Sequence, residues 1–142
     1  MKSVKQMLSA KGAQIYSVRP DSKVIDALRL MAEKNVGALV VLESTRLIGI
    51  FSERDYARKA ILHGKSSGEI TVREIMTSDV VTIEPERTVE ECMALVTSHR
   101  IRHLPVVEND RLLGVISIGD LVKAVIAEQE LTIRQLESYI HS

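Results

Sequence analysis

The segment Gly49-Ile50-Phe51-Ser52-Glu53-Arg54-Asp55 is echoed by Gly114-Val115-Ile116-Ser117-Ile118-Gly119-Asp120, 65 residues further along the chain. Glycine, serine and aspartate keep their places in both segments. The same offset relates further pairs between Pro20 and Ile126, such as Pro20 and Pro85, without an insertion or deletion. A register held over that length predicts two structural units of one kind in tandem.

The hydrophobic pattern predicts the same order of elements in both copies: strand, helix, two strands, helix. In the first copy we expect a strand at 15–18, a helix capped by Asp21 or Ser22, hairpin strands at 38–42 and 47–51, and a helix capped by Ser52. In the second copy we expect a strand at 80–83, a helix at 88–98, strands at 104–107 and 112–116, and a helix from about Ile118 that can run to the C-terminus.

Three shorter segments complete the predicted organisation. A short amphipathic segment at 72–77 leads into the second copy, and a similar one at 4–8 leads into the first. The polar stretch 63–68 is expected to connect the copies flexibly. The predicted domains are therefore a first repeat at 1–66, a second at 67–127 and a C-terminal helical extension at 128–142.

Composition narrows the function classes. The chain has 142 residues, of which 45% are hydrophobic, so it is expected to form a packed globule. Its 19 basic and 19 acidic residues give a net charge of zero, which argues against nucleic-acid or membrane binding driven by bulk charge. No apolar run approaches the length of a membrane span or a signal peptide. Cys92 is the one cysteine and is expected in the core, which fits a cytoplasmic location.

At this point the chain resembles a tandem pair of cystathionine-β-synthase (CBS) domains, often called a Bateman module. The resemblance rests on the two Gly…Ser-x-x-Asp segments, on Val72-Arg73-Glu74-Ile75-Met76-Thr77 and on Ile101-Arg102-His103-Leu104-Pro105-Val106. It implies an α/β (α+β) fold of two β-α-β-β-α units packed sheet to sheet about a pseudo-twofold axis. It also implies a homodimer, and regulatory binding of an adenosine-bearing ligand such as AMP, ADP, ATP, NAD or S-adenosylmethionine.

The Ser-x-x-Asp pairs suit that ligand class on chemical grounds. Each pair follows a strand and begins a helix, where a carboxylate can accept hydrogen bonds from both hydroxyls of a ribose. The serines, beside the first N–H groups of the helix, suit a phosphate or ribose oxygen. The alternative is structural: serine as an N-cap, and aspartate as a first-turn acid that stabilises the helix dipole.

The resemblance implies two clefts, each with residues from both repeats. The first cleft is expected to join Ser52, Arg54 and Asp55 with Val80, Thr82, Arg102 and His103. The second is expected to join Ser117 and Asp120 with Tyr16, Ser17, Gly37 and Ala38. The first set is the more cationic and suits a mono- or diphosphate. Arg102 as a surface residue and His103 as a structural histidine remain the alternative.

Three functions compete. The first is a stand-alone nucleotide sensor that regulates an unknown target protein in trans. The second is an enzyme, which we do not expect, because no nucleophile–base pair, phosphate-binding loop or metal-ligand spacing stands out. The third is a ligand-independent assembly module. In the tail, Leu131, Leu136 and Ile140 at near-helical spacing either cover a partner subunit or fold back on their own sheet.

Overall fold

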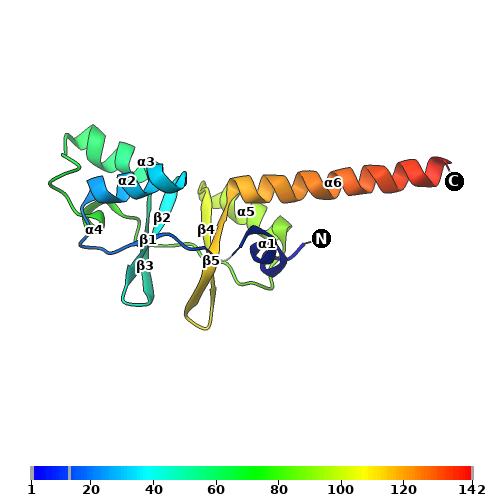
Figure 1. The fold of residues 1–142 in the computed structure, drawn as a ribbon, viewed down its shortest axis with the longest axis horizontal. Helices are drawn as coiled ribbons and strands as arrows, with labels where there is room; N and C mark the ends of the chain where they lie inside the picture. Colours follow the sequence, from blue (N-terminus) through cyan, green and yellow to red (C-terminus); the bar gives the residue numbers. More distant parts are fainter. Residues whose placement is uncertain (1, 13, 142) are drawn as a thin grey trace. The chain divides into compact units, whose positions relative to one another are not determined.

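The computed structural model describes residues 2–12 and 14–141, which form two compact units. The first-repeat unit comprises residues 14–81 and 109–112. The second-repeat unit comprises the described residues of 1–13, 82–108 and 113–142. Figure 1 labels the helices and strands of both units.

The first-repeat unit contains a three-stranded sheet in the order β1-β2-β3. Strand β1 is parallel to β2, and β2 is antiparallel to β3 with Ala38 opposite Ser52, so the predicted hairpin is confirmed. Its elements are β1 (Ser17–Val18), α2 (Val24–Lys34), β2 (Ala38–Glu43), β3 (Arg46–Ser52), α3 (Glu53–Asp55), the π-helical η1 (Tyr56–Ala60), the 3-10 turn η2 (Ile61–His63) and α4 (Val72–Ile75).

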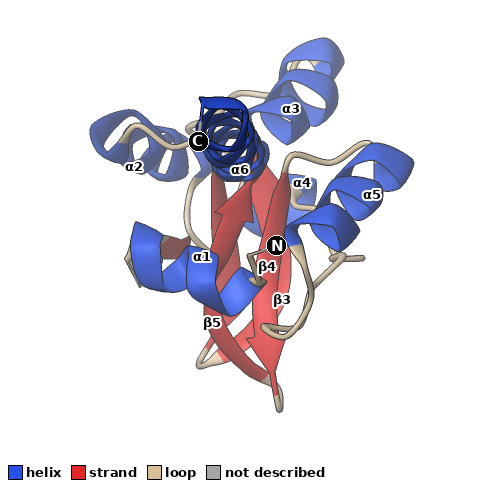
Figure 2. Cartoon of the chain, turned by 90° about the vertical axis from the view of Figure 1, so that its right-hand side faces the viewer, coloured by secondary structure: helices blue, strands red, loops and turns tan. Residues whose placement is uncertain are grey.

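The second-repeat unit repeats the helix–hairpin–helix part of this plan. Its elements are α1 (Val4–Lys11), α5 (Val89–His99), β4 (His103–Glu108), β5 (Arg111–Ser117) and α6 (Ile118–His141). Strands β4 and β5 form a two-stranded sheet, with α1 beside β5 and α5 beside β4 (Figure 2). The mixed helix and strand composition and the two repeats confirm the predicted fold class.

The strand predicted at 80–83 is wrong as an element. Only Ile83 of this segment pairs, through a parallel bridge to Val106. The Ile83 N–H donates to the Pro105 carbonyl at 3.0 Å, and the Val107 N–H donates to the Ile83 carbonyl at 2.9 Å.

Proline explains the shortened pairing. In the first-repeat unit the Val40 N–H donates to the Tyr16 carbonyl at 3.3 Å, which helps to hold β1 against β2. The residue 65 positions after Val40 is Pro105, which has no N–H to donate. The corresponding bond to Val81 therefore cannot form.

The predicted N-cap of α2 is also wrong. The helix begins after Lys23, which makes no side-chain cap, and the Ser22 hydroxyl instead accepts from the Arg19 N–H at 3.1 Å. Backbone carbonyls of the connecting segment take over the capping. The first two N–H groups of α2 donate to Ile70 at 3.0 Å and to Ser67 at 2.9 Å, so no serine cap is needed.

Each lead-in segment packs in the unit of the repeat that it does not lead into. Helix α4, which precedes the second repeat in sequence, belongs to the first-repeat unit, where Val72 and Ile75 join its core cluster. Helix α1 belongs to the second-repeat unit and buries Val4 and Met7. Helix α4 thus completes the core of the first-repeat unit, which it follows in the chain. Helix α1, from the beginning of the chain, packs in the second-repeat unit.

Matching backbone bonds anchor the two lead-in segments. The Val72 and Arg73 N–H groups donate to the carbonyls of Ser22 and Pro20 at 2.8 and 2.9 Å. The Val4 and Lys5 N–H groups donate to the carbonyls of Arg87 and Pro85 at 2.8 and 2.9 Å. The acceptors keep the offset of 65, while Val4 and Val72 are 68 residues apart, which is the three-residue difference visible in the sequence.

Cys92 lies on the inner face of α5 with none of its surface exposed, as predicted for a core residue. Burial raises the pKa of its thiol to about 11, and the nearby Glu91 carboxylate acts in the same direction. The protonated thiol behaves as a small apolar side chain at neutral pH.

Replacement of Gly49 tests the packing of the 76–77 segment on the first repeat. A Cβ atom at Gly49 would lie 2.6 Å from the Met76 sulfur and 3.1 Å from the Thr77 carbonyl oxygen. We expect Gly49→Ala to lower the free energy of unfolding by ~1–3 kcal/mol, because the backbone oxygen cannot give way freely. Urea unfolding followed by circular dichroism measures the change.

Gly68→Ala is the matched control, because no atom lies within 4 Å of the Cβ position there. We expect it to change the unfolding free energy by less than ~0.5 kcal/mol. Equal unfolding midpoints for the two variants would contradict the close approach at Gly49.

Candidate functional site

The first motif lies where β3 ends and α3 begins, and a capping box holds it together. The Asp55 N–H donates to the Ser52 hydroxyl oxygen at 3.1 Å, and the Ser52 N–H donates back to Asp55 Oδ2 at 3.0 Å. The Ser52 hydroxyl lies 3.0 Å from the same carboxylate oxygen. The capping role considered from the sequence is therefore present.

The other carboxylate oxygen of Asp55 is engaged as well. The Thr77 hydroxyl donates to Oδ1 at 2.9 Å, and Lys59 Nζ lies 3.3 Å from it. Asp55 is 8% exposed, and it is the one charged residue that is buried among residues 2–12 and 14–141. Its charge is compensated at both oxygens, which is what a buried carboxylate requires.

The second motif repeats the capping geometry at the β5–α6 junction. The Ser117 N–H donates to Asp120 Oδ2 at 2.8 Å, and the Asp120 N–H donates to the Ser117 hydroxyl at 3.2 Å. Lys11, the last residue of α1, donates through Nζ to Asp120 Oδ2 at 2.7 Å and to the Val115 carbonyl at 2.8 Å. A lysine more than 100 positions earlier in the chain therefore completes this motif.

The ionised form of Asp120 is favoured in this setting. Burial opposes ionisation, but the hydrogen bonds from Lys11 and from Ser117, with the positive charge of Lys11, outweigh it and lower the pKa of the carboxyl group. The carboxylate thus carries a full negative charge at neutral pH, as contact with two ribose hydroxyls requires.

His103 and Arg102 lie close to the second motif within the same unit. The Ile118 N–H, next to Ser117, donates to the Arg102 carbonyl at 2.8 Å. Burial lowers the pKa of His103, the positive charges of Lys11 and Arg102 lower it further, and the Asp120 carboxylate opposes them. The neutral imidazole is therefore favoured, and the charges of Lys11, Arg102 and Asp120 all lie near it.

The same backbone bond recurs in the first-repeat unit, where the side chains differ. The Glu53 N–H donates to the Gly37 carbonyl at 3.1 Å, and Ala38 pairs with Ser52 across the hairpin. Gly37 and Ala38 thus stand where Arg102 and His103 stand in the second-repeat unit. The cationic character of this strand entry is a property of the second repeat.

The remaining predicted site residues divide between the units. Ser52, Arg54, Asp55 and Val80 of the first predicted cleft belong to the first-repeat unit, and Thr82, Arg102 and His103 to the second. Of the second predicted cleft, Tyr16, Ser17, Gly37 and Ala38 belong to the first-repeat unit, and Ser117 and Asp120 to the second. The two cross-repeat clefts therefore stay predictions, whereas each Ser–Asp pair is formed within its own unit.

Sequence reasoning missed Lys11, Lys59 and Thr77. Lys59 follows Asp55 by one helical turn, a spacing visible in the sequence. Lys11 and Thr77 lie in the lead-in segments, and the sequence does not reveal which repeat each segment joins. Lys11 also has no repeated counterpart, because the residue 68 positions later is Asp79.

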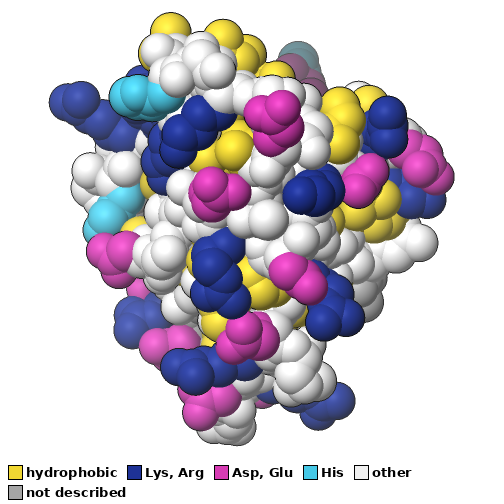
Figure 3. All heavy atoms as spheres, turned by 90° about the vertical axis from the view of Figure 1, so that its left-hand side faces the viewer, with side chains coloured by type: hydrophobic (Ala, Val, Ile, Leu, Met, Phe, Trp, Pro, Cys, Tyr) yellow, Lys and Arg dark blue, Asp and Glu magenta, His cyan; other side chains and the backbone are white. Residues whose placement is uncertain are grey.

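Residues 2–12 and 14–141 contain no group of three or more His, Cys, Asp or Glu side chains placed to hold a metal ion. No helix among them is both long and apolar enough to cross a membrane. On the face drawn in Figure 3, basic and acidic side chains are interspersed rather than gathered by sign.

Comparisons with known proteins agree with the repeat structure. A mitochondrial CBS domain-containing protein of Arabidopsis thaliana is 42% identical over 137 residues, which cover 93% of this chain and 66% of the relative. The chain thus spans just under two thirds of that relative's length. Since the name of the relative places it in mitochondria, the cytoplasmic location expected from the sequence stays a prediction.

Two solved structures have the same fold. A signal-transduction protein with CBS domains from Burkholderia ambifaria is 51% identical with a TM-score of 0.87, over 90% of this chain and 96% of that one. A CBS domain pair in complex with 5′-methylthioadenosine and S-adenosyl-L-methionine has a TM-score of 0.80 at 22% identity, over 90% and 98% of the two chains. That second likeness extends to the fold alone.

The CBS domain profile matches residues 6–61 and again residues 72–127, which together take in both Ser–Asp junctions and most of the chain. The two copies read from the sequence, the two hairpins with capped helices and the solved structures of the same fold all lead to one conclusion: the chain belongs to the CBS domain family.

Proposed function

We propose that this chain is a regulatory CBS pair that binds an adenosine-bearing ligand, AMP, ADP, ATP or NAD, and signals to a target protein in trans. The observation that carries the proposal is the cluster of Asp120, Lys11, Arg102 and His103 in the second-repeat unit. It combines a fixed carboxylate for a ribose with cations for a phosphate. The complex of a related fold with two adenosyl compounds supports this ligand class.

The ribose is proposed to bind at the carboxylate of Asp120. Oδ2 is already occupied by the Ser117 N–H and Lys11, so the ribose hydroxyls would bind on the Oδ1 side or replace the lysine. The Asp120 side chain is 21% exposed, against 11% for Asp55, so it is the more accessible of the two carboxylates.

The phosphate is proposed to bind beside Lys11 and Arg102. Lys11 and Arg102 each carry one positive charge, and Asp120 carries one negative charge. With His103 neutral, the cluster has an excess of positive charge. A guanidinium and an ammonium group bind phosphate oxygens through charge-assisted hydrogen bonds. If a phosphate draws Lys11 away from Asp120, the carboxylate becomes free for the ribose, so the two contacts would form together.

In the first-repeat unit the ligand would meet a more closed site. Thr77, Lys59 and the capping box together engage both oxygens of Asp55. A ribose must displace at least one of these partners, and each charge-assisted bond lost costs about 1.5–3 kcal/mol. We therefore propose that the first-repeat motif, with Arg54, binds its ligand only where a phosphate offsets that cost.

Regulation would follow from unequal affinity of the ligand for two arrangements of the protein, and the shift cannot exceed that difference in affinity. The regulated partner would be a separate protein, and a homodimer is the proposed assembly. A hexameric CBS-containing protein from cyanobacteria, 30% identical over 85% of this chain, shows that a related protein assembles further.

A ligand-independent assembly module is the second candidate function. The observation that favours it is the capping geometry, since Ser52, Asp55, Ser117 and Asp120 all have structural roles without a ligand. An enzymatic function is not proposed, because both Ser–Asp pairs are engaged in capping their helices.

Isothermal titration of the purified protein against AMP, ADP, ATP, NAD and S-adenosylmethionine tests the sensor proposal. We expect saturable binding with a preference for one phosphorylated ligand, and the stoichiometry will show whether one or both motifs are used. The protein must first be shown free of co-purified nucleotide. If folded, nucleotide-free protein binds none of the five compounds, the assembly-module candidate takes its place.

Lys11→Ala and Arg102→Ala test the phosphate assignment. We expect each variant to weaken binding of AMP by ~10-fold or more, because one charge-assisted hydrogen bond is lost. Adenosine binding should change far less, and for Lys11→Ala it should not weaken, since Asp120 is released. Titration of both ligands measures the difference.

Lys5→Ala is the matched control for Lys11→Ala, because Lys5 is an exposed lysine on the same helix. Its titration should resemble that of the unaltered protein. Equal losses of AMP and adenosine affinity in the Lys11 and Arg102 variants would contradict a phosphate contact at these residues.

A further inference from the structure

The second half of helix α6 extends away from the β4–β5 sheet (Figure 1), and its exposed side chains include an apolar stripe. Ile133, Leu136 and Ile140 are 54%, 58% and 74% exposed. The predicted alternative that the tail folds back on its own sheet is therefore wrong. Single exposed apolar residues need no explanation, but a continuous stripe along a helix does.

The spacing of this stripe is that of a coiled coil. The positions alternate by four and three residues along α6: Val122, Ile126, Gln129, Ile133, Leu136 and Ile140. This is a heptad repeat with isoleucine at every a position and, at d, valine, glutamine and leucine. We call these six residues the α6 seam.

The α6 seam is distinct from the face that α6 packs on its own unit. Leu121, at the base of the helix, is fully buried, and Ala124, Val125 and Glu128 are half-buried along the same side. The seam residues Val122 and Ile126 are 43% and 48% exposed in the same turns. The core of the unit therefore leaves the seam free for another helix.

From this arrangement we infer that two copies of the chain associate through a parallel, two-stranded coiled coil of their α6 helices. β-Branched isoleucine occupies every a position, and with leucine at d, as at Leu136, this pattern favours two parallel strands. The seam from Val122 to Ile140 extends about 27 Å at about 1.5 Å per residue. A single helix of that kind is marginal when isolated, so a partner would stabilise it.

Gln129 identifies a second copy as the partner. Its amide lies within an otherwise apolar seam, where an unpaired polar group is costly to bury. A parallel, in-register copy places the amide of one Gln129 against that of the other, so that the two can hydrogen-bond. A purely apolar helix of another protein would leave the amide unsatisfied.

The edges of the α6 seam are compatible with the parallel orientation. The e positions hold Lys123, Glu130 and Glu137, and the g positions hold Val125, Thr132 and Tyr139. In a parallel pair each e residue faces a g residue of the other helix, and no g residue is charged, so like charges do not meet. The contact of Gln129 with its own copy distinguishes this orientation from the antiparallel one, in which Gln129 would face an isoleucine.

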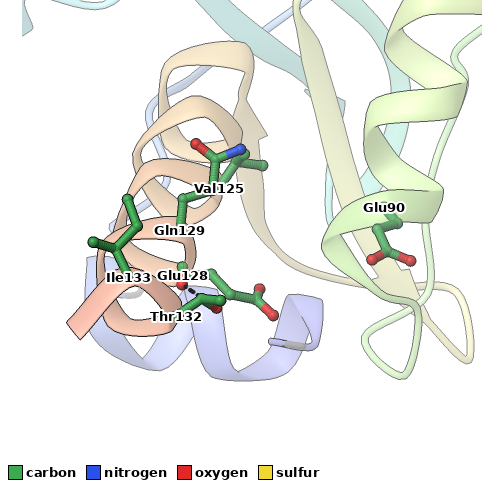
Figure 4. Close-up of a pocket in the computed structure, with 6 residues that line it drawn as sticks. All are labelled: Glu90, Val125, Glu128, Gln129, Thr132 and Ile133. Carbon is green, nitrogen blue, oxygen red and sulfur yellow. Dashed lines mark hydrogen bonds between the residues drawn. The ribbon is translucent and has the colours of Figure 1, made fainter. Parts of the chain in front are cut away.

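Open space borders the α6 seam on the side that faces α5. An open groove of about 540 Å³ lies between α5 and α6, lined by Glu90 on α5 and by Val125, Glu128, Gln129, Thr132 and Ile133 on α6. Figure 4 shows that Glu90 and the α6 side chains stand on opposite sides of this groove. Two of the lining residues, Gln129 and Ile133, belong to the α6 seam.

Disulfide trapping in the full chain tests the inference. In a parallel pair the d positions approach their own mates closely enough for a disulfide. We expect Leu136→Cys to give a covalent dimer on mild oxidation. Ser138→Cys, on the outer f position of the same turn, should give little or none. The native Cys92 is fully buried and does not compete.

A second pair of variants tests whether the seam drives the association. In the Leu136→Cys background, Ile133→Lys should lower the yield of covalent dimer by ~10-fold or more, because a charge replaces a seam side chain. Leu131→Lys is the matched control, since Leu131 is equally exposed at 52% but lies on the outer face. It should leave the yield unchanged.

Circular dichroism must show that helix content is retained in all variants. Trapping at residue 136 but not at 138, reduced by Ile133→Lys alone, would support the parallel coiled coil. Equal trapping at both sites, no trapping at either, or trapping insensitive to Ile133→Lys would each overturn it. The test involves no ligand, so its outcome is independent of the proposed function.

Discussion

The unpaired N–H groups at the start of a helix are the constraint around which both repeats are built. Each repeat turns directly from the last strand of a hairpin into a helix, and the first N–H groups there have no partner within the helix. Ser52 with Asp55, and Ser117 with Asp120, satisfy them through reciprocal hydrogen bonds. This need fixes a carboxylate and a hydroxyl at one defined point of the fold.

The same constraint makes the candidate site and the fold inseparable at these residues. Removal of the Asp55 or Asp120 side chain takes away a cap as well as a ligand contact, and a lost cap alone costs about 0.5–2 kcal/mol. The Arg102 side chain takes no part in the capping hydrogen bonds, whereas Lys11 also donates to the Val115 carbonyl and so helps to hold α1 against β5. Arg102 is therefore the position at which binding can best be separated from folding.

The local part of this structure could be predicted from the sequence. The hairpins, the cap at Ser52 and the long last helix follow from patterns within one short segment. The predictions that failed depend on contacts between residues far apart in the sequence. Carbonyls of Ser67 and Ile70 replaced the predicted cap of α2, and Pro105 shortened a strand some 20 residues before it.

The most consequential failure concerns the lead-in helices. Nothing in the pattern of α1 reveals that it packs with the second repeat, so the contact of Lys11 with Asp120 could not be foreseen. Comparison of the repeats could not reveal it either, because the two aspartates obtain their lysines from different places. Lys59 comes from the turn after Asp55, and Lys11 comes from the opposite end of the sequence.

Helix α6 links the two proposals physically. Its first turn carries Asp120, at which we propose that the ligand binds, and the α6 seam begins two residues later at Val122. A ligand that changes the position of this first turn therefore acts on the helix that we infer to join two copies. Any such coupling must be reciprocal: if the ligand favours association, association must raise the affinity for the ligand by the same factor. Ligand sensing and assembly compete as separate functions on sequence grounds. Both would then act through the same helix, α6.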